Sequence, residues 1–112
     1  MKILLTGANG YIGMRLLPQL LAKGHDVYCA VRDPKRLSIT PTLAEKVTIL
    51  KLDFLSPEKN NSLPIDIDVA YYLIHSMSSD NGDFLTMEAD CAHNFCRMLE
   101  KTKAKQIIYL SG

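Results

Sequence analysis

The 112-residue sequence contains no tryptophan and no excess of charge of either sign. Its 13 lysine and arginine residues are balanced by 12 aspartate and glutamate residues, for a formal net charge of +1. Because the two signs are interleaved along the chain, no basic patch of the kind that binds nucleic acid or an acidic membrane is present. The sequence also has no signal-peptide pattern and no apolar run that approaches the length of a membrane span. We therefore expect a cytoplasmic protein that binds neither nucleic acid nor membrane.

Cysteine is rare, and its three copies are an odd number. Cys29 lies in a strand-like run and Cys91 and Cys96 lie in a helix-like run, which is typical of reduced thiols in a cytoplasmic protein. Cys91, His93 and Cys96 have the side-chain types of a metal site. Positions i, i+2 and i+5 of a helix do not share a face, however, so we expect no metal site.

The sequence does contain a regular alternation of short apolar runs and helical patterns. Hydrophobic residues make up 47% of the chain, which is enough for a single core at this length. Strands are expected at residues 3–6, 27–31, 47–52, 69–74 and 106–110, and helices at 11–23, 42–46, from 56 onward, and at 84–103. Because no hairpin signal interrupts the alternation, it predicts a parallel sheet with right-handed crossovers. We expect an α/β fold, a doubly wound sheet of about five strands in the order 3-2-1-4-5.

Apolar spacing predicts which face of each long helix is buried. For the first helix, the expected apolar stripe consists of Ile12, Leu16, Leu17, Leu20 and Leu21. For the last helix, the expected inward face consists of Leu85, Ala89, Ala92, Cys96 and Leu99.

Three glycines connect the first strand to the first helix. Gly7, Gly10 and Gly13 are spaced G-x-x-G-x-x-G, directly after the apolar run 3–6. Gly7 suits a tight turn, Gly10 leaves no Cβ where a pyrophosphate must approach, and Gly13 allows close packing of helix and strand. The amides at the helix start would face such a ligand with the positive end of the helix dipole behind them. The order strand, glycine turn, helix therefore predicts a nucleotide site.

Residues 6–13 (TGANGYIG) resemble the extended and atypical short-chain dehydrogenase/reductases. This group includes the nucleoside-diphosphate-sugar epimerases and dehydratases and the NmrA-like NAD(P)-binding proteins. Residues 24–27, 31–34, 53 and 106–111 also fall where that family has counterparts, so the resemblance covers nearly the whole chain. It implies a Rossmann-type NAD(P)-binding domain over residues 1–112. It further implies the N-terminal part of a longer protein, without the substrate lobe and inactive alone.

The resemblance also bears on the choice of cofactor. NAD-preferring relatives end the second strand with an acid that binds the ribose diol, whereas this chain has Val31 followed by Arg32. A guanidinium suits a 2′-phosphate, and Lys35 and Arg36 add positive charge, so we expect NADP rather than NAD. Asp33 is a complication, because it lies about 20 residues after Gly13, the usual distance of the ribose acid. The alternative for Arg32 is a solvated turn residue.

Further cofactor contacts are implied by position in the family pattern. The residues expected to bind are Gly7, Asn9, Gly10, Tyr11, Ile12, Gly13, Arg32, Asp53, Phe54, Leu73, Ile74 and His75. Asp53 would accept a hydrogen bond from the adenine amino group, with Phe54 against the ring. The end of the fourth strand would pass the ribose, mainly through its backbone. The alternatives are that Asp53 caps a turn and that His75 is a hydrogen-bonded wall residue.

The family's catalytic Tyr-x-x-x-Lys pair does not occur in this sequence. None of its five tyrosines has a lysine four residues later, and Gly112 aligns with the usual assisting hydroxyl although Ser111 is close. No catalytic residue is therefore assigned. Three interpretations follow: the cofactor-binding part of an oxidoreductase or epimerase-like enzyme, a non-catalytic NADP sensor of NmrA type, or a parallel α/β domain that binds no cofactor. The fifth strand would be an open sheet edge, which a homodimer could cover.

Overall fold

The computed structural model describes residues 1–8, 10–37, 39–54, 63–73 and 84–109. Its strands are β1 (Lys2–Thr6), β2 (Asp26–Val31), β3 (Val47–Lys51), β4 (Val69–Tyr72) and β5 (Gln106–Tyr109). Its helices are α1 (Tyr11–Ala22), the 3₁₀ turn η1 (Pro34–Arg36), α2 (Pro41–Ala44) and α3 (Phe84–Leu99). The helix expected from Ser56 lies outside the described residues, as do Asn9, Ile74 and His75.

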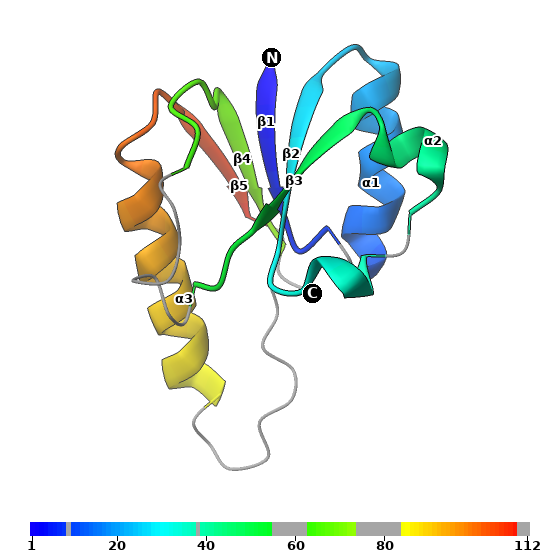
Figure 1. The fold of residues 1–112 in the computed structure, drawn as a ribbon. Coiled ribbons are helices and arrows are strands. Elements are labelled where there is room, and N and C mark those ends of the chain that lie inside the picture. Colours follow the sequence, from blue (N-terminus) through cyan, green and yellow to red (C-terminus); the bar gives the residue numbers. More distant parts are fainter. Residues whose placement is uncertain (9, 38, 55–62, 74–83, 110–112) are drawn as a thin grey trace.

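The five strands form one parallel sheet in the order β3-β2-β1-β4-β5, which confirms the predicted topology. Figure 1 shows the sheet edge-on between α1 and α2 on one face and α3 on the other. Because all strands run the same way, their carboxyl ends meet at one edge, at the lower side of this view. That edge carries the turn between β1 and α1.

Period-two alternation in the strands divides the core between the two faces. In β1, Ile3 and Leu5 point to the α1 face, where they pack with Leu17 and Leu20. Leu4 points to the α3 face and packs against the group that contains Phe95. A fully buried thiol, Cys29, lies on the α1 side, where burial raises its pKa to about 11. Strands β1 and β2 are thus covered on both faces of the sheet, as their continuous apolar runs predict.

Helix α1 ends one residue before the predicted boundary. Two of its last carbonyls accept hydrogen bonds from the residues beyond the helix: the Gly24 amide donates to Leu21 O at 3.0 Å, and the His25 amide donates to Leu20 O at 3.2 Å. Gly24 has a φ of +84°, so this is a Schellman ending. The predicted apolar stripe is wrong at Ile12, which is 37% exposed because it lies at the helix start, beyond the strands that cover the later turns.

Helix α3 buries part of the predicted face: Leu99 is buried and Ala92 packs against the core, but Cys96 does not. The side chains of Leu85 and Ala89 lie outside the described residues. Cys91, Phe95 and Leu99 are buried at spacings of four, whereas Cys96 is exposed. The expectation for Cys96 is wrong because the large Phe95 ring sets the rotation of the helix. It contacts Phe54 edge-on at 5.4 Å between ring centroids, and Tyr72 at 4.9 Å.

The end of α3 also comes earlier than the predicted residue 103. The Thr102 hydroxyl donates to Leu99 O at 2.7 Å and accepts from the Ala104 amide at 3.2 Å, which turns the chain towards β5. The strand boundaries differ from prediction by one residue at β1, β2 and β3 and by two at β4, while the predicted last residue of β5, residue 110, lies outside the described residues.

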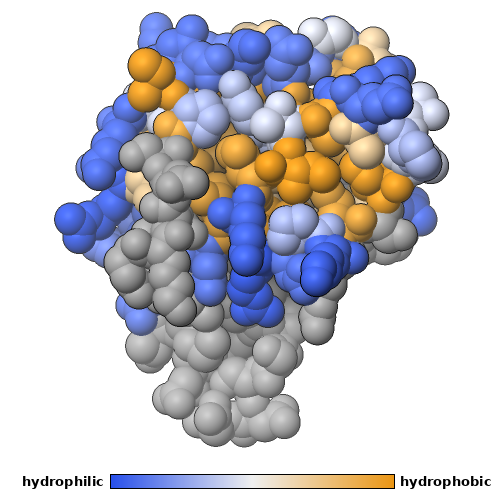
Figure 2. All heavy atoms as spheres, viewed as in Figure 1, coloured by the Kyte–Doolittle hydropathy of each residue, from blue (hydrophilic) through white to orange (hydrophobic). Residues whose placement is uncertain are grey.

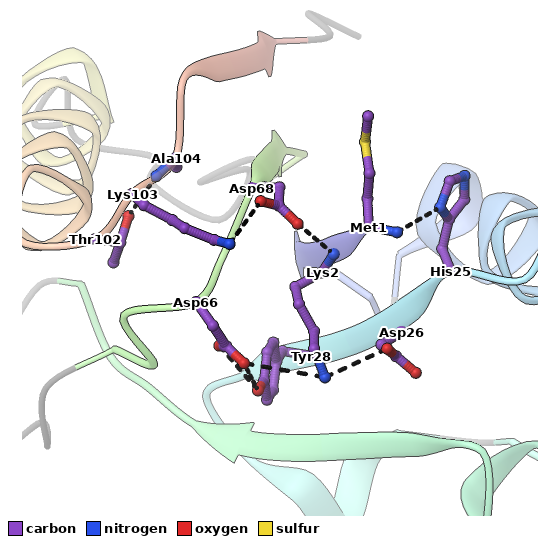
Figure 3. Close-up of polar contacts among 10 residues, drawn as sticks. All are labelled: Met1, Lys2, His25, Asp26, Tyr28, Asp66, Asp68, Thr102, Lys103 and Ala104. Carbon is purple, nitrogen blue, oxygen red and sulfur yellow. Dashed lines mark hydrogen bonds and ion pairs between the residues drawn. The ribbon is translucent and has the colours of Figure 1, made fainter.

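A polar network holds the amino edge of the sheet, opposite the β1–α1 turn (Figure 3). Asp68 is its centre, because its carboxylate accepts from the Lys2 amide at 2.8 Å and pairs with Lys103 Nζ at 3.3 Å. These contacts, the Lys2 amide first, lower the pKa of Asp68. Beside it, Tyr28 Oη donates to Asp66 at 3.1 Å, and burial is the main cause that raises the Tyr28 pKa. The network joins the starts of β1 and β4 to the segment that leads into β5.

The two outer strands differ from the central ones in exposure. On β3, Ile49 is 39% exposed, and on β5, Ile107 and Tyr109 are 45% and 53% exposed. Figure 2 shows hydrophobic residues gathered in the middle of the face on which β3 lies, with hydrophilic residues around them. Among the described residues, no helix is long and apolar enough to cross a membrane.

Candidate functional site

The first component of the site is the turn that leaves β1. Gly7 has a φ of +67°, a conformation that side chains disfavour. A Cβ there would lie 2.7 Å from the carbonyl oxygen of Leu73, so the turn approaches the end of β4 too closely for any side chain. The turn is closed by the Gly10 amide, which donates to Gly7 O at 2.9 Å.

Gly13 brings the first turn of α1 against this same loop. A Cβ on Gly13 would lie 2.9 Å from the Cα of Ala8 and would also overlap the Gly7 carbonyl. Helix α1 therefore begins directly beside the turn. Both glycines are needed for steric reasons that the G-x-x-G-x-x-G spacing predicts.

The start of α1 presents backbone amides without a side-chain cap of its own. The N-cap residue is Gly10, and the first turn contains no acidic residue. The first intrahelical bond of this turn runs from Met14 N to Gly10 O, so the amides of Tyr11, Ile12 and Gly13 have no acceptor within the helix. Such amides, with the helix dipole behind them, can bind an anion.

A buried hydroxyl, which the sequence analysis did not single out, connects this turn to the neighbouring strand. Thr6 is fully buried, and its Oγ1 donates to Tyr71 O at 2.8 Å and accepts from the Leu73 amide at 3.2 Å. It therefore fixes the end of β1 to the end of β4 immediately before Gly7. A threonine that closes an apolar strand before a glycine is the only sequence signal for this role.

Strand register brings residues from three strands to one edge. Thr6 lies opposite Ala30 in β2, so Gly7 is level with Val31, and Arg32 follows directly. The Leu52 amide donates to Val31 O at 2.9 Å, which places Asp53 at the neighbouring strand end. From β1 the chain proceeds through β2 and β3 to one side and through β4 and β5 to the other. The glycine turn is thus at the topological switch point, where open parallel sheets bind ligands.

The segment after β2 is stabilised by a hydrogen bond from its own backbone to the side chain of Asp33. Arg32 is exposed, and Asp33 is the N-cap of η1, with its Oδ1 accepting from the Lys35 amide at 3.1 Å. Asp33 thus bonds the loop backbone. The sequence alone left this carboxylate available as a ribose ligand.

The two candidate residues that follow β3 differ in burial. Asp53 is half-buried, while Phe54 is 4% exposed with its ring packed on Phe95. The Phe54 carbonyl accepts from Asn94 Nδ2 at 2.6 Å, which ties this strand end to α3. Leu73, at the end of β4, is buried and meets the glycine turn through its backbone.

The cysteine and histidine side chains of α3 do not converge. Cys91 is buried, whereas His93 and Cys96 are exposed. Within the described part of the chain, no group of three or more potential metal ligands is found.

Comparison with known proteins agrees with this geometry. A model of the NAD(P)H-binding family matches residues 7–112, and none of the curated proteins compared matches the chain significantly. Among solved structures, the oxidoreductase ylbE from Lactococcus lactis is similar with 22% identity and a TM-score of 0.75, over 99% of this chain and 48% of its own. A UDP-galactose 4-epimerase has 16% identity and a TM-score of 0.78, over 100% of this chain and 38% of its own.

A third similar structure is the yeast methylglyoxal/isovaleraldehyde reductase complexed with NADPH, with 15% identity and a TM-score of 0.72. The match covers 100% of this chain and 37% of that protein. This chain therefore spans less than half the length of these three structures, which show its fold. With the family match over nearly all its residues, the chain belongs to the NAD(P)H-binding family and has the NAD(P)-binding fold of reductase- and epimerase-like proteins.

Proposed function

We propose that this chain binds NADP(H) in preference to NAD(H), as the cofactor-binding part of an oxidoreductase or epimerase-like enzyme and without activity of its own. The observation that carries the proposal is the turn from β1 to α1. There the space that Cβ atoms on Gly7 and Gly13 would need is taken by backbone, and three amides of α1 have no helical acceptor.

This turn fits a pyrophosphate. Gly10 has no side chain, so a phosphate can approach the amides of Tyr11, Ile12 and Gly13. The exposure of Ile12 agrees with a residue that borders such a ligand. Asn9, which lies between Gly7 and Gly10 in the sequence, is assigned as a further contact. A bound nicotinamide cofactor supplies hydride chemistry, and the residues of this chain bind and orient it.

Arg32 supports the preference for NADP. It is exposed directly after the buried Val31, which offers no hydrogen bond to a ribose diol. A guanidinium binds a 2′-phosphate through a charge-assisted, forked interaction. The carboxylate of Asp33 accepts from the Lys35 amide, which draws it towards the loop backbone.

The remaining contacts follow the strand ends. We assign Asp53 to the adenine amino group, because it is half-buried at the strand end beside Arg32. The Phe54 ring is in the core, so we assign its adenine contact to the backbone. Leu73, with Ile74 and His75 after it, is assigned to the ribose side through the backbone.

The test is a calorimetric titration of the chain with NADPH, NADH, 2′,5′-ADP and ADP. We expect NADPH and 2′,5′-ADP to bind more tightly than NADH and ADP. In Arg32→Ala we expect NADPH affinity to fall about 10-fold to 100-fold, because one charge-assisted bond contributes about 1.5–3 kcal/mol. NADH affinity should change less than about twofold, since NADH lacks the phosphate.

Arg97→Ala is the matched control. Arg97 is exposed in the last turn of α3, which leads to the amino edge of the sheet, away from the glycine turn. The substitution Arg97→Ala removes one positive charge, as Arg32→Ala does, but it does not touch the proposed site. Equal affinity of the wild-type chain for NADPH and NADH, or no binding of either ligand pair, would contradict the proposal.

A non-catalytic NADP sensor of NmrA type is the alternative function. It is favoured by the lack of a Tyr-x-x-x-Lys pair in this sequence. Tyr28 bonds Asp66 at the edge opposite the glycine turn, and the ring of Tyr72 is buried against Phe95. A Tyr-x-x-x-Lys pair elsewhere in the protein that contains this chain would favour the enzyme, and its absence the sensor.

A further inference from the structure

We infer that Asp33 is a positioning residue for the 2′-phosphate side of the cofactor site and does not bind the ribose diol. This inference rests on the proposed function. Its basis is the hydrogen bond from the Lys35 amide to Asp33 Oδ1, at 3.1 Å, within a turn that is otherwise rich in basic residues.

The turn is anchored in the core on both sides. At its entry, Val31 is 3% exposed and its carbonyl accepts from the Leu52 amide at 2.9 Å. At its exit, the Leu37 amide donates to Pro34 O at 3.2 Å, and Leu37 packs against the apolar group on the α1 face. Residues 32–36 therefore form a short bridge between two fixed points. The conformation of this bridge decides where Arg32 is presented.

Within the bridge, one acid stands among three bases. Arg32 and Lys35 are cationic, and the repulsion between like charges opposes a compact turn. Asp33 counteracts this as an N-cap, since its carboxylate accepts from the second residue of η1 while Pro34 fixes the first. The acid thus holds the cationic loop in one arrangement beside the end of β2.

The same contact separates this role from that of a diol ligand. A ribose diol is bound by a carboxylate that faces the ligand, with both hydroxyls as donors. Here Oδ1 of the carboxylate accepts from the Lys35 amide, which commits one of its two oxygens to the loop backbone. Asparagine can replace aspartate as an N-cap with little loss, whereas alanine cannot.

The experiment compares Asp33→Asn with Asp33→Ala in titrations with NADPH and NADH. Both variants lack the charge, so the difference between them isolates the cap. We expect Asp33→Asn to bind NADPH at least as tightly as wild type. We expect Asp33→Ala to bind NADPH about threefold to tenfold more weakly than Asp33→Asn, with NADH affinity within about twofold in both.

Thr40→Ala is the matched control, because Thr40 Oγ1 caps α2 in the same connection by accepting from the Leu43 amide at 3.3 Å. It should leave the ratio of NADPH to NADH affinity unchanged.

If both Asp33 variants instead lose NADH affinity, Asp33 is a diol ligand and the inference is wrong. If Arg32→Ala abolishes the preference but the Asp33 variants are alike, only the inference fails. If wild type shows no preference for NADPH, the proposed function fails as well.

Discussion

At the scale of single residues, steric and hydrogen-bonding demands are concentrated where β1 becomes α1. Gly7 and Gly13 are adjacent to backbone atoms that exclude a Cβ, and Thr6 joins two strand ends through one buried hydroxyl. The glycines could be predicted from their spacing, because each is required by the local path of the chain. Thr6 could not, because its two partners, one in β4 and one just after it, are more than sixty residues away along the chain.

Thr6→Val tests the contribution of that hydroxyl. The substitution keeps the shape but leaves the buried Leu73 amide without its acceptor, so we expect the free energy of unfolding to fall by about 1–3 kcal/mol. Urea denaturation followed by circular dichroism measures it. Thr6→Ser, which keeps the hydroxyl and loses a methyl group worth roughly 0.8 kcal/mol, is the comparison. A valine variant as stable as wild type would show that the hydrogen bonds contribute little.

At the scale of elements, the rotation of a helix depends on what it packs against. The apolar spacing of α3 is compatible with a face through Cys96 and with one through Phe95. The structure buries Phe95, which fills the space between Phe54 and Tyr72 from two different strand ends. The existence of α3 followed from its local sequence, but its buried face depended on aromatic partners that are distant along the chain.

Phe95→Ala and Cys96→Ala distinguish the two faces directly. We expect Phe95→Ala to lower the free energy of unfolding by about 3–5 kcal/mol, because it leaves a cavity among aromatic rings. The neighbouring Cys96→Ala should change it by less than about 0.5 kcal/mol, because its side chain is exposed. The shift in urea midpoint measures both. A larger loss from the cysteine substitution would restore the predicted burial of Cys96.

At the scale of the whole molecule, the carboxyl and amino ends of the strands carry different groups of residues. The carboxyl edge carries the glycine turn, Arg32 and Asp53, while Asp68 organises the amino edge through Lys2 and Lys103. At the lateral edge, β5 exposes Ile107 and Tyr109. Pairing of a second copy along β5 stays a prediction.

The lowered pKa of Asp68 predicts acid sensitivity. An unfolded aspartate takes up its proton near pH 3.9, before the folded one does, so this contribution to stability is present above about pH 4 and is lost as pH falls further. We expect wild type to be more stable than Asp68→Asn at pH 7, and the difference to shrink below about pH 4. Urea unfolding between pH 2.5 and 7 measures this. A difference that is constant over this range would contradict the pKa shift.

The class of the protein could be predicted from local sequence patterns. Strand and helix periodicity, the absence of hairpin signals and the three glycines specified a parallel α/β sheet with a turn for a dinucleotide, because these features depend on neighbouring residues. Four features required the folded chain: the burial of Phe95 in place of Cys96, the bonds by which Thr6 joins β1 to β4, the core position of the Phe54 ring, and the bond of Asp33 to its own loop. Most of these outcomes depend on packing and hydrogen bonds between segments far apart in the chain. The contact of Asp33 is local, but it requires one backbone conformation among several that the same residues allow.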